Sequence, residues 1–204
     1  MASTAQAILA DVPECPRGSR IIEDYVARVM RAGDTDDADT IATRASRSKR
    51  TEVRMMGALC CGYLDDGDAA FPLLQAHYSQ DSDWRVREMM AKAFDHACKR
   101  RGHATCLAVI RDWLEAGNAG MRRAVCEGLR PWTSRSPFRE QPSLAVALLA
   151  PLHCDPDDDT RLSAAHALAD ISKKHPAVVR DAISRWDIAD PRVSAVARHA
   201  ARHL

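Results

Sequence analysis

Five runs of apolar and small residues recur along the chain, and each run begins just after an arginine. These arginines are Arg54, Arg87, Arg122, Arg161 and Arg192. Their spacings of 33, 35, 39 and 31 residues are close to the lengths of repeats built from a pair of helices. Because one helix pair cannot bury its apolar face alone, such pairs stack on one another. The pattern predicts an all-α fold, a curved α-solenoid of antiparallel helix pairs that works through its concave surface.

The apolar periodicity also predicts where the helices lie. The predicted ranges are 20–31, 37–47, 50–64, 68–79, 84–101, 103–116, 119–131, 142–153, 158–174, 176–186 and 191–203. The acidic segment 33–40 predicts a loop and a helix cap, and the start of the chain, with Pro13 and Pro16, shows no clear pattern. The longest break, WTSRSPFREQ at 132–141, predicts a basic, aromatic loop on the functional face.

Composition narrows the class of protein. A chain of 204 residues that is 46% hydrophobic can bury a sizeable core, and we expect one domain, 1–204, with residues 84–204 as its better-defined repeats. No apolar run is long enough to span a bilayer, and the first twenty residues lack a secretory signal, so we expect a cytoplasmic protein with no membrane partner. The seven cysteines include no C-x-x-C pair, which predicts buried free thiols. We expect no metal, no cofactor and a monomer.

The net charge of +1 hides an uneven distribution of charge. Lys and Arg against Asp and Glu number 9 and 14 in residues 1–83, 12 and 5 in 84–139, and 8 and 9 in 140–204. A single charged residue is ordinarily just solvated. The basic middle block, however, also contains three of the four tryptophans. It therefore predicts a surface that attracts an anionic partner.

Aligning the repeats on their arginines predicts a packing seam and a polar face. Small residues stand four and six positions after the arginine: Ala58, Ala91, Cys126 and Ala165, then Cys60, Ala93, Gly128 and Ala167. Between them stand Leu59, Lys92, Glu127 and His166, and about one turn later Asp95, Arg130 and Asp170. The polar residues among them predict neighbouring columns on adjacent helices: Lys92 with Asp95, Glu127 with Arg130, and His166 with Asp170 and Lys173. The columns form either a functional site or a salt-bridge network that fixes the stacking of the repeats.

The same residues resemble a known family. The run RRAVCEGLRPWTSRSPF, followed by HALADISKKHP and Trp186, is similar to the DNA alkylation repair proteins built from HEAT-like repeats, the group with the AlkD and AlkC branches. The segment DWRVREMMAKAFDHACKRRG is typical of its smaller members, which lack an extra C-terminal domain. The resemblance runs from about Trp84 to the C-terminus. The E-G-x-R-P and D-I-S-K-K blocks at this separation are moderately specific, whereas Val-Arg is common to many solenoids.

The resemblance implies a DNA glycosylase that excises cationic N-alkylated bases, such as 3-methyladenine or 7-methylguanine, from double-stranded DNA. Alkylation makes the base a good leaving group, so the enzyme needs negative charge to stabilise the sugar cation. Tryptophan faces attract a cationic base, and Lys and Arg hold phosphates. No cofactor is implied.

By their positions in these motifs, Glu127 and Asp170 are the expected catalytic carboxylates, and Asp95 is a third candidate. Trp132 and Trp84 are expected to stack on the lesion. The expected DNA contacts are Arg87, Lys92, Arg123, Arg130, Arg135, Arg139, Lys173 and Lys174.

Two departures from the family pattern leave an alternative open. Lys92 stands where the AlkC-like branch tends to have an acid, and His166 replaces an asparagine. The alternative is a non-catalytic HEAT-like module that binds DNA or another protein.

Overall fold

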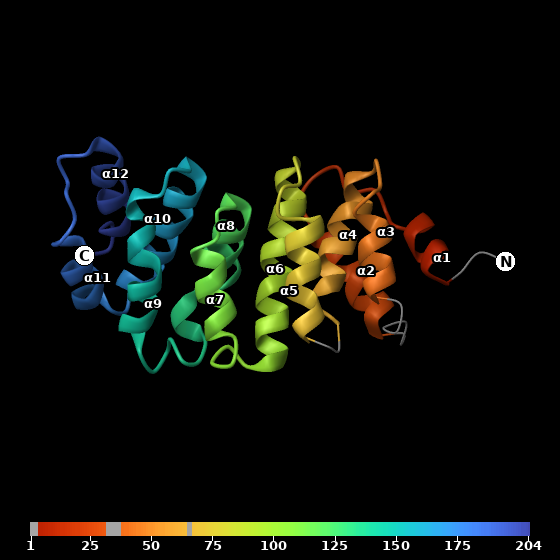
Figure 1. Cartoon of the computed structure of the whole chain (residues 1–204), viewed down its shortest axis with the longest axis horizontal. Coiled ribbons are helices and arrows are strands. Elements are labelled where there is room, and N and C mark those ends of the chain that lie inside the picture. Colours follow the sequence, from red (N-terminus) through yellow and green to blue (C-terminus); the bar gives the residue numbers. More distant parts are fainter. Residues whose placement is uncertain (1–3, 32–37, 65–66) are drawn as a thin grey trace. The chain divides into compact units, whose positions relative to one another are not determined.

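The computed structural model describes residues 4–31, 38–64 and 67–204, and every regular element in this part of the chain is a helix. The chain divides into two compact units, Met1–Arg101 and Gly102–Leu204. Figure 1 shows the helices of each unit arranged side by side. The expectation of one continuous domain remains a prediction. No helix within the described residues is long and apolar enough to cross a membrane.

The N-terminal unit contains α1 (Thr4–Ala10), α2 (Arg20–Arg31), α3 (Ala38–Ala45), α4 (Thr51–Cys61), α5 (Gly67–His77) and α6 (Trp84–Arg101). Helices α2, α4 and α6 pack in succession, and α3 and α5 cover α4 from the other layer. The core between the layers includes the fully buried Met55, Met56, Met89, Met90 and Phe94. The two layers are those of helix-pair repeats.

The C-terminal unit repeats this arrangement. It contains α7 (Leu107–Leu114), α8 (Ala119–Gly128), the 3-10 helix η2 (Trp132–Ser134), α9 (Pro142–Leu149), the 3-10 helix η3 (Ala150–Cys154), α10 (Asp158–Ser172), α11 (Pro176–Ile183) and α12 (Pro191–Ala200). Helix α10 packs between α8 and α12, while α9 and α11 contact each other and α10. Side-chain caps start α8, α10 and α12, because Asn118, Asp157 and Asp190 each accept a hydrogen bond from a backbone N–H of the first turn.

Most predicted helices lie within a few residues of the observed ones, and 84–101 agrees at both ends. Helix α7 begins later than predicted because Gly102, with a φ of 86°, starts a turn that occupies residues 103–106. The last part of the predicted helix 142–153 is the 3-10 helix η3, in which Pro151 has no N–H to donate. Helix α1 was not predicted, because it is short and buries only Ala5 and Ile8. Residues 33–37 of the acidic segment lie outside the described residues.

The small-residue seam is confirmed, since seven of its eight residues are buried and only Gly128 is half-buried. Leu59, which takes the same position in its repeat as Lys92, Glu127 and His166, is 2% exposed and belongs to the core. Six cysteines are buried free thiols, and Cys154 is exposed. Burial raises the pKa of Cys60 to about 12, so this thiol stays protonated and inert.

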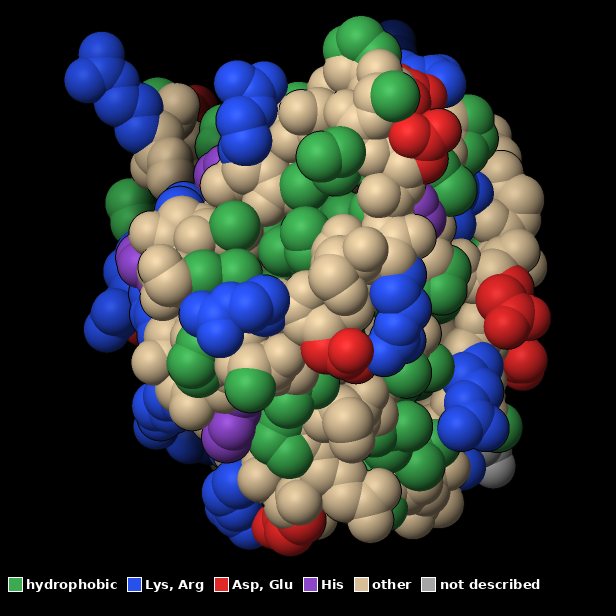
Figure 2. All heavy atoms as spheres, turned by 90° about the vertical axis from the view of Figure 1, so that its left-hand side faces the viewer, with side chains coloured by type: hydrophobic (Ala, Val, Ile, Leu, Met, Phe, Trp, Pro, Cys, Tyr) green, Lys and Arg blue, Asp and Glu red, His purple; other side chains and the backbone are tan. Residues whose placement is uncertain are grey.

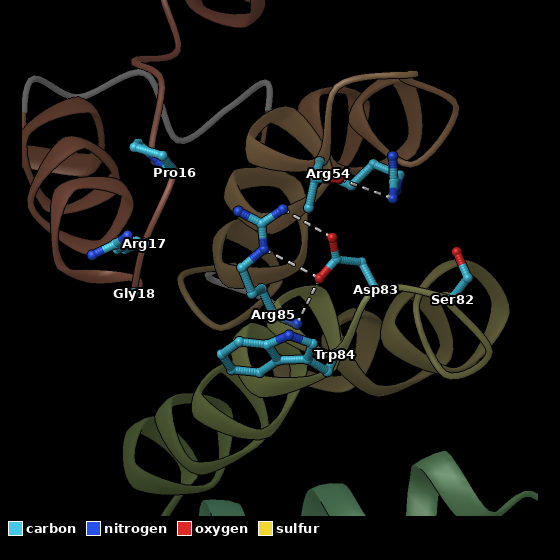
Figure 3. Close-up of a pocket in the computed structure, with 9 residues that line it drawn as sticks. Pro16, Arg17, Gly18, Arg54, Ser82, Asp83, Trp84 and Arg85 are labelled. Atoms are coloured by element: carbon cyan, nitrogen blue, oxygen red, sulfur yellow. Dashed lines mark hydrogen bonds and ion pairs between the residues drawn. The ribbon is translucent and has the colours of Figure 1, made fainter.

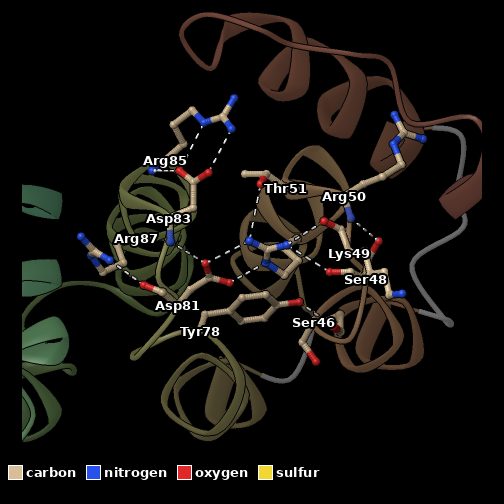
Figure 4. Close-up of polar contacts among 12 residues, drawn as sticks. Ser46, Ser48, Lys49, Arg50, Thr51, Tyr78, Asp81, Asp83, Arg85 and Arg87 are labelled. Atoms are coloured by element: carbon tan, nitrogen blue, oxygen red, sulfur yellow. Dashed lines mark hydrogen bonds and ion pairs between the residues drawn. The ribbon is translucent and has the colours of Figure 1, made fainter.

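The recurrent arginines tie neighbouring repeats together through aspartates. In the N-terminal unit, Arg54 Nε donates to Asp81 Oδ2 at 2.7 Å. Arg87 Nη1 donates to the backbone oxygen of the same Asp81 (Figure 4). In the C-terminal unit, Arg122 pairs with the Asp155 carboxylate, and Arg161 donates to the Asp155 backbone oxygen. Each aspartate therefore bridges two arginines from successive inner helices. The recurrence that identifies the repeats in the sequence is a stacking device.

Candidate functional site

Glu127 of α8 and Asp170 of α10 meet at one guanidinium. Arg130 lies 3.0 Å from Glu127 (Nη1 to Oε2) and 2.7 Å from Asp170 (Nη2 to Oδ2). Lys173 Nζ donates to the other Asp170 oxygen, Oδ1, at 3.0 Å. We call Glu127, Arg130, Asp170 and Lys173 the carboxylate cluster. The alignment on arginines therefore places Glu127 and Asp170 on one face, as the sequence predicts.

The carboxylate cluster is partly open to solvent. The side chain of Asp170 is 15% exposed and that of Glu127 is 32% exposed. Burial raises the pKa of Asp170, but the hydrogen bonds from Arg130 and Lys173 outweigh burial and leave this pKa below its ordinary value. Asp170 is therefore ionised at neutral pH and held in one position by two cations.

His166 borders the cluster from the same helix as Asp170. Its ring lies 4.5 Å from the ring of His199 on α12. Burial, followed by the charge of Arg130, lowers the pKa of His166. Burial and the neighbouring His166 likewise lower the pKa of His199. Both imidazoles are thus neutral at pH 7, and they add hydrogen-bonding groups without adding charge.

Trp132 is a core residue, which corrects its predicted role in stacking on a lesion. Its side chain is 0% exposed, its Nε1 donates to the Cys126 backbone oxygen at 3.2 Å, and its ring centroid lies 4.9 Å from that of Phe138. A side chain without accessible surface offers no face to a base. The aromatic residues of the 132–141 loop therefore pack inward, and only its polar residues face solvent.

Trp84 and Asp95, the other predicted site aromatic and acid, both belong to α6 of the N-terminal unit. Trp84 is 60% exposed and begins the helix. Asp95 is half-buried and lies about three turns further along the same helix. The structure thus brings Glu127 and Asp170 together within one unit and places Trp84 and Asp95 in the other.

Lys92 is held between two acids that sequence reasoning missed. Its Nζ lies 2.7 Å from Glu23 Oε1 on α2 and 3.0 Å from Glu88 Oε1 on its own helix. Burial lowers the pKa of Lys92, but the bonds to Glu23 and Glu88 outweigh burial and raise this pKa above its ordinary value. The spacing of Glu88 and Lys92, four residues apart on a helix, was the available signal. The charge of Lys92 is thus already balanced within the N-terminal unit.

The other side chains predicted to contact phosphates differ in the hydrogen bonds and ion pairs that they already form within the protein. Arg87 is part of the Asp81 bridge, and Arg123 lies 3.4 Å from Asp159. Arg139 pairs with Glu140 at 2.7 Å, and Arg135 donates to the Pro131 backbone oxygen at 3.1 Å. Lys174 is exposed.

One face of the surface shows how side chains of the two charges are distributed (Figure 2). At the C-terminal end of the chain, Lys and Arg side chains are scattered among hydrophobic ones, and acidic side chains lie beside some of them (Figure 2). This face carries no continuous basic patch. In the basic block 84–139 itself, acidic side chains pair with Lys92, Arg123, Arg130 and Arg139.

Comparison with known proteins identifies the family. The model of the DNA alkylation repair enzyme family matches residues 16–204. The crystal structure of AlkD2 from Streptococcus mutans has 32% identity and a TM-score of 0.91, with 98% of this chain and 97% of that chain covered. That of smu.31 from Streptococcus mutans UA159 has 32% identity and a TM-score of 0.86, with 91% and 92% covered.

Two further similarities are more distant or cover less of the chain. The Pseudomonas fluorescens alkylpurine DNA glycosylase AlkC, bound to DNA containing an abasic site analogue, has 24% identity and a TM-score of 0.50 over 76% of this chain and 47% of that chain, and so shares the fold. The uncharacterised YhaZ of Bacillus subtilis is 33% identical over 102 residues, which make up 48% of this chain but only 29% of YhaZ. The chain belongs to the DNA alkylation repair enzyme family and has its all-helical, HEAT-like repeat fold.

Proposed function

We propose that this protein is a DNA glycosylase that excises cationic N-alkylated bases, of the 3-methyladenine and 7-methylguanine type, from duplex DNA. Its membership of the DNA alkylation repair enzyme family and the shared fold with the alkylpurine DNA glycosylase AlkC support this function. The observation that carries the proposal is the convergence of Glu127 and Asp170, from neighbouring inner helices, on Arg130.

The chemistry needs a fixed negative charge. When the bond between the sugar C1′ and the alkylated base breaks, its electron pair leaves with the base and neutralises the charge of the base. The sugar is left with oxocarbenium character, which a preorganised carboxylate stabilises. Water then adds to C1′ and loses a proton, which yields an abasic site and the free base.

The two acids have different roles in this proposal. Asp170 is the less exposed of the two and is held ionised by two cations, so we assign it the stabilisation of the sugar cation. Glu127 is more accessible and is paired with Arg130, so it is suited to position water and receive its proton. Arg130 is a positioning residue, because it fixes both carboxylates relative to each other.

The function is tested by incubating purified protein with DNA treated with a methylating agent and measuring the free bases by chromatography. Release of 3-methyladenine or 7-methylguanine above a heat-inactivated control supports the proposal. A protein that binds this DNA and releases no base contradicts it.

A specific observation favours one other candidate, a non-catalytic DNA-binding module. Both acids of the carboxylate cluster are already paired with cations, and Lys92 stands between Glu23 and Glu88. In that case the cluster stabilises the packing of α8 against α10. Replacing Asp170 would then lower thermal stability and leave the reactivity toward methylated DNA at its background value.

A further inference from the structure

A solvent-open hollow of about 710 Å³ lies in the N-terminal unit, whereas the residues assigned above to excision belong to the C-terminal unit. Its walls are residues 16–18, the start of α4 with Thr51 and Arg54, and residues 82–85 at the start of α6 (Figure 3). The volume is within the range of sites that bind small molecules.

Trp84 gives this hollow an aromatic surface. The indole is 60% exposed, whereas Trp113 and Trp132 are 3% and 0% exposed and Trp186 is half-buried. It lies beside the Arg85 side chain on the floor of the hollow (Figure 3). An exposed indole costs free energy in water, so a planar ligand that covers it gains from both burial and stacking.

The charged residues around Trp84 determine which charge on a ligand is favoured. Three arginines and one aspartate line the hollow. Arg54 is paired with Asp81, and Arg85 donates to Asp83 at 2.9 Å and to the Cys15 backbone oxygen at 3.0 Å, which fixes both guanidinium groups.

Arg17 is the available cation. It is exposed, and no hydrogen bond or ion pair of its guanidinium is found within the described residues. Arg54 is paired with Asp81, and Arg85 is paired with Asp83 and Glu52, so Arg17 supplies the charge that a ligand would meet. A ligand that combines a flat neutral ring with an anionic group satisfies both Trp84 and Arg17.

We propose that this hollow binds one unpaired nucleotide of DNA, with its base stacked on Trp84 and a neighbouring phosphate paired with Arg17. In a duplex both faces of an internal base are already stacked, so only an unpaired or terminal nucleotide has a face free for the indole. The choice of DNA rests on the proposed function, but the site does not depend on catalysis by Glu127 or Asp170. In this proposal Trp84 binds unpaired bases at DNA ends or gaps and does not hold the cationic lesion.

The first test measures stacking. A short oligothymidine is compared with an oligomer of equal length made of abasic sugar-phosphates, and affinity and tryptophan fluorescence are recorded. We expect oligothymidine to bind more tightly and to quench fluorescence. Trp84→Ala should lose affinity for oligothymidine on the order of tenfold and leave the abasic oligomer unaffected.

The controls assign the quenching to Trp84. Trp84→Phe should keep most of the affinity and lose the quenching, whereas Trp186→Phe, which alters a half-buried tryptophan of the other unit, should keep both. Equal binding of the two oligomers, or unchanged affinity and quenching in Trp84→Ala, overturns the proposal. Because Trp84 is exposed, far-ultraviolet circular dichroism should show that its variants fold.

The second test measures the phosphate contact. Arg17→Gln should weaken oligothymidine binding and reduce the slope of log affinity against log salt by ~0.7, the value for one phosphate on a single strand. Arg31→Gln removes the same charge from the last residue of α2 and should change the affinity less. Equal losses in both variants overturn the assignment of Arg17.

A free nucleotide is the other possible source of the same chemistry. Thymidine monophosphate should bind much more weakly than oligothymidine, and equal affinities contradict the assignment to DNA. These results are independent of base release. Failure of stacking leaves the excision activity of wild-type protein intact, and loss of excision in carboxylate variants leaves the quenching by oligothymidine intact.

Discussion

Arg122 and Asp155 form a buried ion pair with two hydrogen bonds, of 2.6 Å from Nε and 2.8 Å from Nη2. Their side chains are only 9% and 4% exposed. The pair joins the start of α8 to the segment before α10, and its counterpart in the N-terminal unit is Arg54 with Asp81. The two units therefore use the same electrostatic device at equivalent places in their repeats.

Asp155→Ala should destabilise the C-terminal unit strongly, because it leaves the Arg122 guanidinium buried without its counter-charge. The expected loss is about 3 to 5 kcal/mol in the free energy of unfolding, measured by urea denaturation. Asp159→Ala, which breaks the more exposed pair with Arg123, is the matched control and should cost less than about 1 kcal/mol. Equal losses would show that the buried pair has no special role.

Acid should weaken the contact around Asp83. Hydrogen bonds from Arg85 lower the pKa of Asp83 from 3.8 to about 2. In the folded protein Asp83 thus binds fewer protons than in the unfolded chain, so its contribution is complete above about pH 5 and is lost as the pH falls toward about 2. As the pH falls between these values, the free energy of unfolding should therefore decrease less in Asp83→Asn than in wild type. The difference should be at most about 2 kcal/mol. The exposed Asp24→Asn serves as control, and the same pH profile in Asp83→Asn and wild type would contradict this account.

Trp132→Ala should lower the free energy of unfolding of the protein. Its indole fills the core beneath the 132–141 loop, so truncation should cost about 3 to 5 kcal/mol, measured by thermal or urea denaturation. Trp84→Ala should change stability little, because that side chain is 60% exposed. A Trp132→Ala protein of wild-type stability that fails to act on methylated DNA would instead restore the role in lesion stacking.

Binding of duplex DNA should depend on Arg135 and Arg139, the partly exposed cations of the 132–141 loop. Each contact with a phosphate contributes ~0.9 to the slope of log affinity against log salt. Arg135→Gln and Arg139→Gln should each reduce that slope by about this amount. Arg185→Gln, a change of the same charge on an exposed residue after α11, is the control. An unchanged slope in both loop variants excludes the loop from the DNA surface.

The sequence was sufficient to predict the helical repeats, because their signal is local. Small residues such as Ala91 and Ala165 recur at fixed distances from an arginine, and helical geometry then places them on one seam. The same register placed Glu127 and Asp170 on one face. The partners of these residues were partly predictable too, since Arg130 follows Glu127 by three positions on adjacent turns.

The predictions that were wrong or missing concern residues whose surroundings are set by tertiary contacts. Whether Trp132 points into the core or into solvent is decided by how the 132–141 loop folds against α9 and α10, and its basic, aromatic composition does not determine this. Likewise, Glu23 reaches Lys92 across 69 positions in the chain. Asp81 and Asp155 were overlooked because they lie between the apolar runs, where an acidic residue ordinarily indicates only a loop or a cap.

The central claim is that Asp170 stabilises the sugar cation during base excision. Its most direct test is the single-turnover rate of 3-methyladenine and 7-methylguanine release by wild type, Asp170→Asn and the exposed control Asp181→Asn, together with DNA affinity. We predict that Asp170→Asn is slower on the order of 100-fold, while DNA binding is retained and Asp181→Asn keeps the wild-type rate. Wild-type protein that releases no base, or Asp170→Asn that releases base at the wild-type rate, would contradict the account.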